Sequence, residues 1–120
     1  MSESDEDQKL KALRAEVWLR TKEVTLARIT VLEEALSALV RGILTAEQRT
    51  AAAGEAHKLA GSLGTFGFLE AGQLAREMEL LWKQAGELKT VEANRLANLL
   101  PQLRQQIKDS EGNLRRDSSA

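Results

Sequence analysis

Cysteine is absent from the 120 residues of this chain, and proline and histidine each occur only once. Without cysteine the protein has neither a disulfide framework nor thiol chemistry, which is compatible with a reducing cytosol. A zinc site needs several Cys, His or carboxylate ligands, so a single histidine argues strongly against one. The same count rules out a di-iron bundle, which requires paired Glu-x-x-His motifs. We therefore expect no metal ion and no cofactor.

Aromatic residues make up only 3% of the chain, and no apolar run is long enough to span a membrane. Alanine and leucine dominate the apolar set, which favours helix throughout and gives strands little support. Lysine and arginine number 17 against 18 acidic residues, and this net charge of −1 gives no electrostatic reason to expect nucleic-acid binding. The acidic N-terminus resembles neither a secretory signal nor a transit peptide. We expect a cytoplasmic protein that binds neither nucleic acid nor membrane.

The single histidine, His57, lies in a segment with helical periodicity. At 3.6 residues per turn, one stripe of this helix is apolar and forms the core face: Ala52, Ala56, Leu59, Leu63 and Phe66. His57 points away from that stripe, and the positions around it are small: Ala53, Gly54, Gly61 and Gly64. Each interior glycine costs a helix up to about 1 kcal/mol relative to alanine. The glycines therefore indicate close approach by another surface, most simply a partner, although a crossing with a second helix could also use them.

Two segments resemble the signature of histidine phosphotransfer (HPt) domains: His57-Lys58-Leu59-Ala60-Gly61-Ser62 and Gly64-Thr65-Phe66-Gly67-Phe68. The second is especially similar to the phosphotransfer domain of chemotaxis-type histidine kinases. The motif covers about a dozen positions, and the helical pattern extends the resemblance over most of the chain. The resemblance implies a four-helix bundle whose histidine is reversibly phosphorylated and passes the phosphoryl group to or from an aspartate. The chain departs from the family at Ala60, where lysine is usual.

Helical segments and their breaks can be placed along the first half of the chain. Residues 8–41 contain neither glycine nor proline and form either one long helix or two helices with a break near Lys22. Gly42 is suited to end this segment, since glycine tolerates left-handed geometry. A candidate capping box, with Thr45 and Gln48 as its two members, begins a second helix over residues 46–65.

In the second half, a third helix is predicted over residues 69–85, and a last helix contains Pro101, which should kink or divide it near Leu100. Residues 1–7 form a polar, acidic segment that we expect to be disordered, and residues 110–120 form a polar tail. Residues 8–109 make up the domain. With the resemblance, these elements predict an all-α fold, an antiparallel up-down four-helix bundle with a long or broken N-terminal helix.

The third helix carries a candidate partner for the histidine. Its apolar stripe is Leu74, Met78, Leu81 and Ala85, and a separate polar stripe contains Gln73, Arg76, Glu79 and Lys83. A short connection makes the two helices antiparallel neighbours and could bring the polar stripe alongside His57. The resemblance implies that Glu79, in a Met-Glu pair, hydrogen-bonds the imidazole. A carboxylate that accepts from Nδ1–H would leave the lone pair on Nε2, but Glu79 could equally be an ordinary surface carboxylate.

Two cations are candidate neighbours for a phosphoryl group. Lys58 follows His57 but projects about 100° round the helix, and Arg76 comes from the third helix, where an ion pair with Glu79 is the simpler interpretation. The candidate docking face for a partner consists of small residues with an apolar rim: Gly54, Gly61, Gly64, Leu69 and Gly72.

The sequence has no glycine-rich loop for nucleotide phosphates, so we do not expect it to phosphorylate itself from ATP. The function that the resemblance implies is a phosphoryl carrier, not an enzyme. It would exchange the group between His57 and the aspartate of a response-regulator receiver domain, or accept it from a histidine kinase. The alternatives are a non-catalytic helical adaptor and an inactive phosphotransfer domain that keeps only its docking face. We expect a monomer, because the bundle can close its own core.

Overall fold

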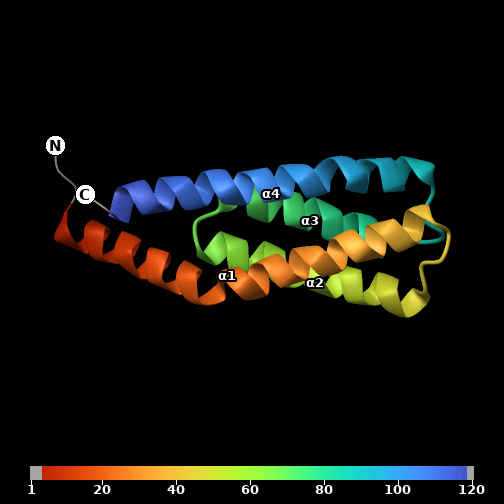
Figure 1. The fold of residues 1–120 in the computed structure, drawn as a ribbon, viewed down its shortest axis with the longest axis horizontal. Helices are drawn as coiled ribbons and strands as arrows, with labels where there is room; N and C mark the ends of the chain where they lie inside the picture. Colours follow the sequence, from red (N-terminus) through yellow and green to blue (C-terminus); the bar gives the residue numbers. More distant parts are fainter. Residues whose placement is uncertain (1–3, 119–120) are drawn as a thin grey trace.

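A computed structural model describes residues 4–118, which form four α-helices: α1 (Asp5–Val40), α2 (Ala46–Thr65), α3 (Leu69–Lys83) and α4 (Thr90–Ser118). They pack as an elongated antiparallel bundle of 54 × 23 × 20 Å, which confirms the predicted all-α fold. Figure 1 shows that α1 and α4 project beyond α2 and α3 at the end of the bundle where both chain termini lie. None of the helices within residues 5–118 has the length and apolarity that a bilayer crossing requires.

The N-terminal helix α1 is continuous, which decides between the two arrangements that its sequence allowed. Ser4 is its N-cap, and the Ser4 hydroxyl accepts a hydrogen bond from the backbone N–H of Asp7 at 3.2 Å. Acidic side chains in the first turn also favour a helix start there. Residues 5–7 therefore belong to the helix, and their assignment to a disordered segment was wrong. Residues 1–3 of that segment lie outside the described residues.

Helix α4 is also longer than predicted: it passes through Pro101 undivided and continues to Ser118, where the sequence indicated a polar tail from residue 110. Pro101 and Ala97, whose carbonyl loses its helical partner, are both exposed, so solvent can satisfy that carbonyl. The extension is anchored on α1, because the indole Nε1–H of Trp18 donates to Glu111 Oε2 at 2.7 Å. Lys22 pairs with the same oxygen at 2.8 Å.

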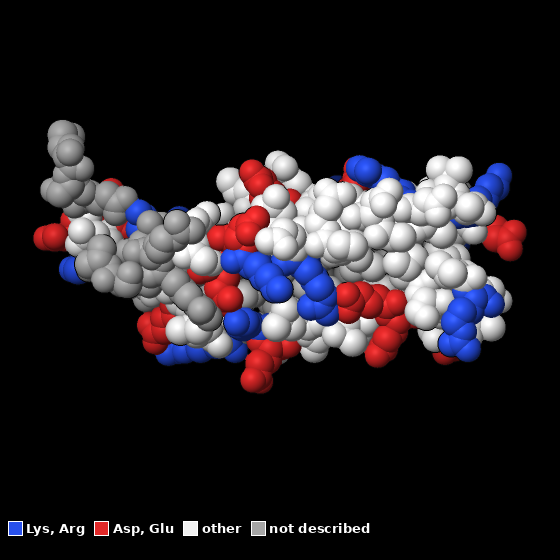
Figure 2. Space-filling view, turned by 45° about the horizontal axis from the view of Figure 1, so that its top comes forward, with Lys and Arg blue, Asp and Glu red and all other residues white. Residues whose placement is uncertain are grey.

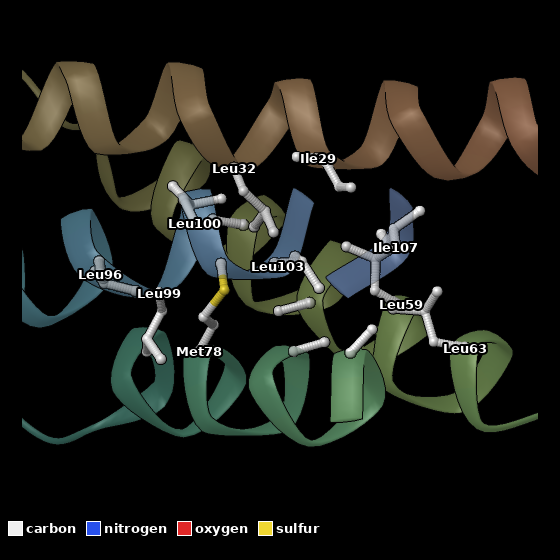
Figure 3. Close-up of a cluster of buried hydrophobic side chains, with 14 of the residues drawn as sticks. Ile29, Leu32, Leu59, Leu63, Met78, Leu96, Leu99, Leu100, Leu103 and Ile107 are labelled. Carbon is white, nitrogen blue, oxygen red and sulfur yellow. The ribbon is translucent and has the colours of Figure 1, made fainter. Parts of the chain in front are cut away.

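The core lies between all four helices (Figure 3). The apolar stripe predicted around the histidine is buried throughout, as are the leucines on the inner face of α4: Ala52, Ala56, Leu59, Leu63, Phe66, Leu96, Leu99, Leu100 and Leu103. Thr45 and Gln48 form the predicted capping box, with hydrogen bonds of 3.0 and 2.9 Å between their side chains and backbone N–H groups. This cap and the buried stripe together set the rotation of α2, and so direct His57 outward.

The buried face of α3 differs from the prediction. Met78 is buried, but Leu74 and Leu81 are only half-buried, and Ala85 lies beyond the end of the helix at Lys83. The residues that are buried include several small ones: Ala71, Gly72, Ala75, Met78, Glu79 and Trp82. The small side chains let α3 pack closely against α2, where Gly72 faces the backbone of Ala60 and Gly64. A search for large apolar residues therefore selects the wrong stripe.

Three aromatic rings fix the turn between α2 and α3. Trp18 contacts Phe66 and Phe68 with ring centroids 5.6 and 5.0 Å apart, and the two phenylalanines are 6.0 Å apart. Gly67 between them has φ +83°, a conformation that side chains rarely adopt. The Phe-Gly-Phe segment thus reverses the chain and buries its rings on α1. Its consequence for function is that α3 returns antiparallel beside α2.

Charged side chains of both signs are interspersed on the surface, next to a broad uncharged region on the face shown in Figure 2. Many are paired between helices. Arg104 of α4 binds both oxygens of Glu33 in α1 at 2.8 and 2.7 Å, and Arg28 of α1 binds Glu55 of α2 at 2.8 Å. Exposed pairs of this kind contribute between zero and about 1 kcal/mol each, so stability comes mainly from the core.

Candidate functional site

His57 lies on the exposed surface of α2, on the side next to α3. Its side chain is 65% exposed, and its Nδ1 lies 2.9 Å from Oε2 of Glu79, whose side chain is only 3% exposed. The structure therefore places Glu79 beside the imidazole and excludes the interpretation of Glu79 as an ordinary surface carboxylate. The helical phase of α2 and the aromatic turn together produce this pairing, since they bring the middle of α3 alongside His57.

Glu79 is an ionised carboxylate in a largely buried position. The hydrogen bond from the Lys83 ammonium lowers the pKa of Glu79 most; burial opposes this effect, and the contact with His57 adds to it. Lys83 Nζ lies 2.6 Å from Oε2, while the guanidinium of Arg76 lies 3.5 Å from Oε1. An ionised carboxylate can only accept a hydrogen bond, so Nδ1 of His57 carries the proton. The lone pair of the neutral imidazole is then on Nε2.

The lowered pKa of Glu79 predicts a pH-dependent contribution to stability. Such a carboxyl stabilises the fold fully above its ordinary pKa of 4.5, and this contribution is lost as the pH falls through the lower folded value. We expect the difference in unfolding free energy between the wild type and Glu79→Gln, measured by urea unfolding, to shrink from about pH 6 to about pH 3. Glu33 and Glu92, whose pKa values are also lowered, are present in both proteins. A difference that does not change with pH would contradict the lowered pKa.

An open groove of about 550 Å³ runs between α2 and α3 beside the imidazole. Its lining residues are small or polar, with one apolar residue at the edge: His57, Ala60, Gly61, Gly64, Leu69, Gly72, Gln73 and Arg76. Leu69 is 67% exposed and forms the rim. Four of the five predicted docking residues therefore line one groove. Gly54 lies outside it, next to Lys83 in a neighbouring hollow.

The glycines of α2 have open space where a side chain would begin. Outside its own stretch of helix, a Cβ atom added at Gly54, Gly61 or Gly64 would meet no atom of the described residues within 4 Å. Gly72 differs, because its added Cβ would lie 3.5 Å from the carbonyl oxygen of Ala60, at the crossing of α3 with α2. The helix crossing therefore explains Gly72, whose added Cβ would also lie 3.5 Å from the backbone nitrogen of Gly64. Gly54, Gly61 and Gly64 weaken the helix and leave their own side-chain positions open beside His57.

Of the two candidate cations, the structure brings Arg76 and not Lys58 into the groove with His57. Lys58 lies 3.8 Å from Glu55, which also binds Arg28, and this cluster is on the α1 side of α2. Ala60, where the family usually has lysine, lines the groove with a methyl group. The candidate cation that lines the groove therefore comes from α3 and not from α2.

Lys83 is the site residue to which sequence reasoning assigned no role. It belongs to the predicted polar stripe, and its position four residues after Glu79 is the usual spacing of an ion pair on one helix. That spacing could have identified the contact with Glu79. The sequence could not show that the same carboxylate oxygen also faces the imidazole.

The site presents one nucleophilic nitrogen, Nε2, at an open surface, with its ring held through Nδ1. Within residues 4–118, no three His, Cys, Asp or Glu side chains gather in an arrangement that could hold a metal ion. The arrangement is suited to accept an electrophilic group from a partner molecule that docks over the groove.

Comparison with known proteins gives two matches. A protein-family model described as "Hpt domain" matches residues 18–113. Protein RcaC of Microchaete diplosiphon is 35% identical over 104 residues, which cover 87% of this chain but only 16% of RcaC. No solved structure matches the chain significantly.

Proposed function

Because the chain belongs to the Hpt domain family, the histidine phosphotransfer modules of phosphorelays, which are phosphoryl carriers and not kinases, we propose that His57 carries the phosphoryl group. His57 is the only histidine of the chain. The observation that carries the proposal is the 2.9 Å contact between His57 Nδ1 and Glu79, since it leaves Nε2 as the nucleophile at an exposed position.

The proposed step is a transfer between a nitrogen and a carboxylate oxygen. Nε2 attacks the phosphorus of a phosphoaspartate on a receiver domain, the P–Nε2 bond forms, and the P–O bond to the aspartate breaks, which releases its carboxylate. The Nδ1 proton stays on the ring and remains bonded to Glu79, whose negative charge stabilises the cationic phosphoimidazole. The reverse step returns the group to an aspartate. Mg²⁺ belongs to the receiver's site and not to this domain.

Arg76 is the proposed neighbour of the phosphoryl oxygens. It shares the groove with His57, and its side chain is 62% exposed, so the guanidinium can turn toward an added anion. Lys58 is a weaker candidate because it pairs with Glu55 on the other side of α2.

The partner would dock over the groove. Gly54, Gly61 and Gly64 keep the α2 surface beside the imidazole open, while Leu69 and Gly72 line the groove on the α3 side. We propose a receiver domain or a histidine kinase as this partner. The likeness of Gly64-Thr65-Phe66-Gly67-Phe68 and of Met78-Glu79 to chemotaxis-type phosphotransfer domains extends the proposal to a protein of that type. A monomer in the cytoplasm fits a core closed within one chain and the lack of cysteine.

Transfer from a phosphorylated receiver domain to this protein tests the proposal. We expect a label that is labile in acid and stable in alkali, as a phosphoramidate is, and that maps to Nε2 of His57 by NMR. Absence of label from several receivers and kinases, with the protein folded, would contradict the proposal. That result would favour the adaptor or the inactive phosphotransfer domain.

Replacing Glu79 by glutamine is expected to lower the transfer rate by about tenfold to a hundredfold, as loss of the hydrogen-bonded partner does for metal-ligating histidines. The amide can donate to Nδ1 and so favours the tautomer in which Nε2 carries the proton. Single-turnover transfer from a saturating receiver measures this rate. Glu77→Gln on the exposed side of α3 is the matched control and should transfer normally. Equal rates for the two variants would contradict the role of Glu79.

A further inference from the structure

One oxygen of Glu79 has two hydrogen-bonding partners. Oε2 lies 2.9 Å from His57 Nδ1 and 2.6 Å from the ammonium of Lys83, so the cation and the imidazole meet at the same atom. The other oxygen, Oε1, is buried and accepts no hydrogen bond, and its contact with Arg76 at 3.5 Å is longer than a hydrogen bond. Among the described residues, His57 and Lys83 are therefore the two hydrogen-bond donors to the Glu79 carboxylate.

We propose that Lys83 is a positioning residue for His57: its ammonium orients the Glu79 carboxylate so that the imidazole proton stays on Nδ1 and the lone pair stays on Nε2. This role rests on the proposed function, because the position of the proton on Nδ1 matters only if Nε2 accepts a phosphoryl group. A positioning role differs from that of Arg76, which lines the groove itself. Lys83 lies outside the groove and acts through Glu79.

The need for such a residue follows from the torsions of a glutamate side chain. Rotation about its terminal bond is broad, so one hydrogen bond to an exposed and mobile ring does not fix the plane of the carboxylate. Lys83 is four residues from Glu79 on the same helix, where the two side chains meet without any change of backbone. Its short contact therefore ties the carboxylate to α3 before any partner arrives.

Other charges near the imidazole do not take this role. On α2 the neighbouring charges are Glu55 and Lys58, which pair with each other and with Arg28 of α1. On α3 the other charge is Arg76, which lies 3.5 Å from Oε1 of Glu79 without a hydrogen bond to it. Lys58 is thus a matched control: it is a lysine beside His57, about as exposed as Lys83, that does not bind Glu79.

The test measures the tautomer directly in the unphosphorylated 120-residue chain. Because the chain has one histidine, its imidazole ¹⁵N signals are unambiguous. At about pH 8.5, where an imidazole is neutral, we expect the wild type, Lys83→Arg and Lys58→Met to show the proton on Nδ1. Lys83→Met should give a measurable population of the tautomer with the proton on Nε2, because the Glu79 carboxylate is no longer held toward Nδ1. Lys83 is half exposed, so its truncation leaves no buried cavity, and thermal unfolding verifies the fold.

Phosphotransfer supplies the second readout. With a saturating receiver, Lys83→Met should transfer about threefold to tenfold more slowly, with an unchanged apparent KM and with recovery in Lys83→Arg. An unchanged tautomer in Lys83→Met would overturn the positioning role, whatever the rate. If the tautomer changes but the wild type accepts no phosphoryl group, Lys83 positions His57 and the proposed function is wrong.

Discussion

Replacing His57 by glutamine is expected to abolish phosphoryl acceptance, to below the detection limit of a labelling assay. The reaction needs a nitrogen with a lone pair, and the glutamine amide has no nucleophilic nitrogen. No other residue of the chain can substitute chemically, because there is no second histidine. The measurement is label transferred from a phosphorylated receiver domain to each protein, followed by treatment with acid.

The fold should survive this change. The His57 side chain is 65% exposed and lies outside the core, and the variant loses one hydrogen bond to Glu79, so we expect unfolding free energy to fall by no more than about 1 kcal/mol. Circular dichroism and thermal unfolding measure this. Lys58→Gln, next in sequence, is the control that should still accept the label. Acid-labile label on His57→Gln would contradict the assignment of His57.

The same variant separates a carrier from an adaptor. A helical adaptor recognises its partner by the shape of the α2–α3 surface, which His57→Gln leaves nearly intact. Binding of an unphosphorylated receiver domain to the variant, measured by calorimetry, should therefore be close to wild type while transfer is lost. If the wild type also binds without transferring, the chain is an inactive phosphotransfer domain, and Ala60 in the groove is the first position to examine.

Local signals explain the parts of the fold that the sequence predicted well. The start of α2 depends on Thr45 and Gln48, which contact each other across a single turn, and its end depends on Phe66 and Gly67. The outward direction of His57 follows from the phase of the buried stripe on the same helix. Each of these features is determined within a few residues, so the sequence pattern shows it directly.

Features that depend on contacts between distant residues were predicted less well. The continuation of α4 past residue 110 depends on Glu111 binding Trp18, which is 93 residues away in the sequence. The burial of Glu79 depends on how closely α3 packs on α2. In the sequence, Glu79 lies between an arginine and a lysine on one polar stripe, a pattern typical of a surface residue. Glu79 contacts His57 because the turn at Gly67 brings α3 back alongside α2.

Placing glutamine at Gly61 or Gly64 is expected to stabilise the protein and to impair phosphotransfer. Glutamine favours helix over glycine by up to about 1 kcal/mol, and the added Cβ meets no atom of the described residues within 4 Å outside its own stretch of helix. A partner that docks over the groove would meet the new side chain instead. Overpacking of a close contact costs about 1–3 kcal/mol, so kcat/KM for transfer should fall by about tenfold to a hundredfold.

The opposite signs of these two effects make the test specific. Loss of transfer in a destabilised variant has many causes, but loss in a variant that unfolds at a higher temperature points to the surface itself. Gly112→Gln on α4 is the matched control, since an added Cβ is equally free there and the position is remote from His57. It should raise stability and leave kcat/KM unchanged. If Gly61→Gln and Gly64→Gln also transfer at the wild-type rate, the partner does not approach over the α2–α3 groove. The glycines would then not serve to keep a docking surface open.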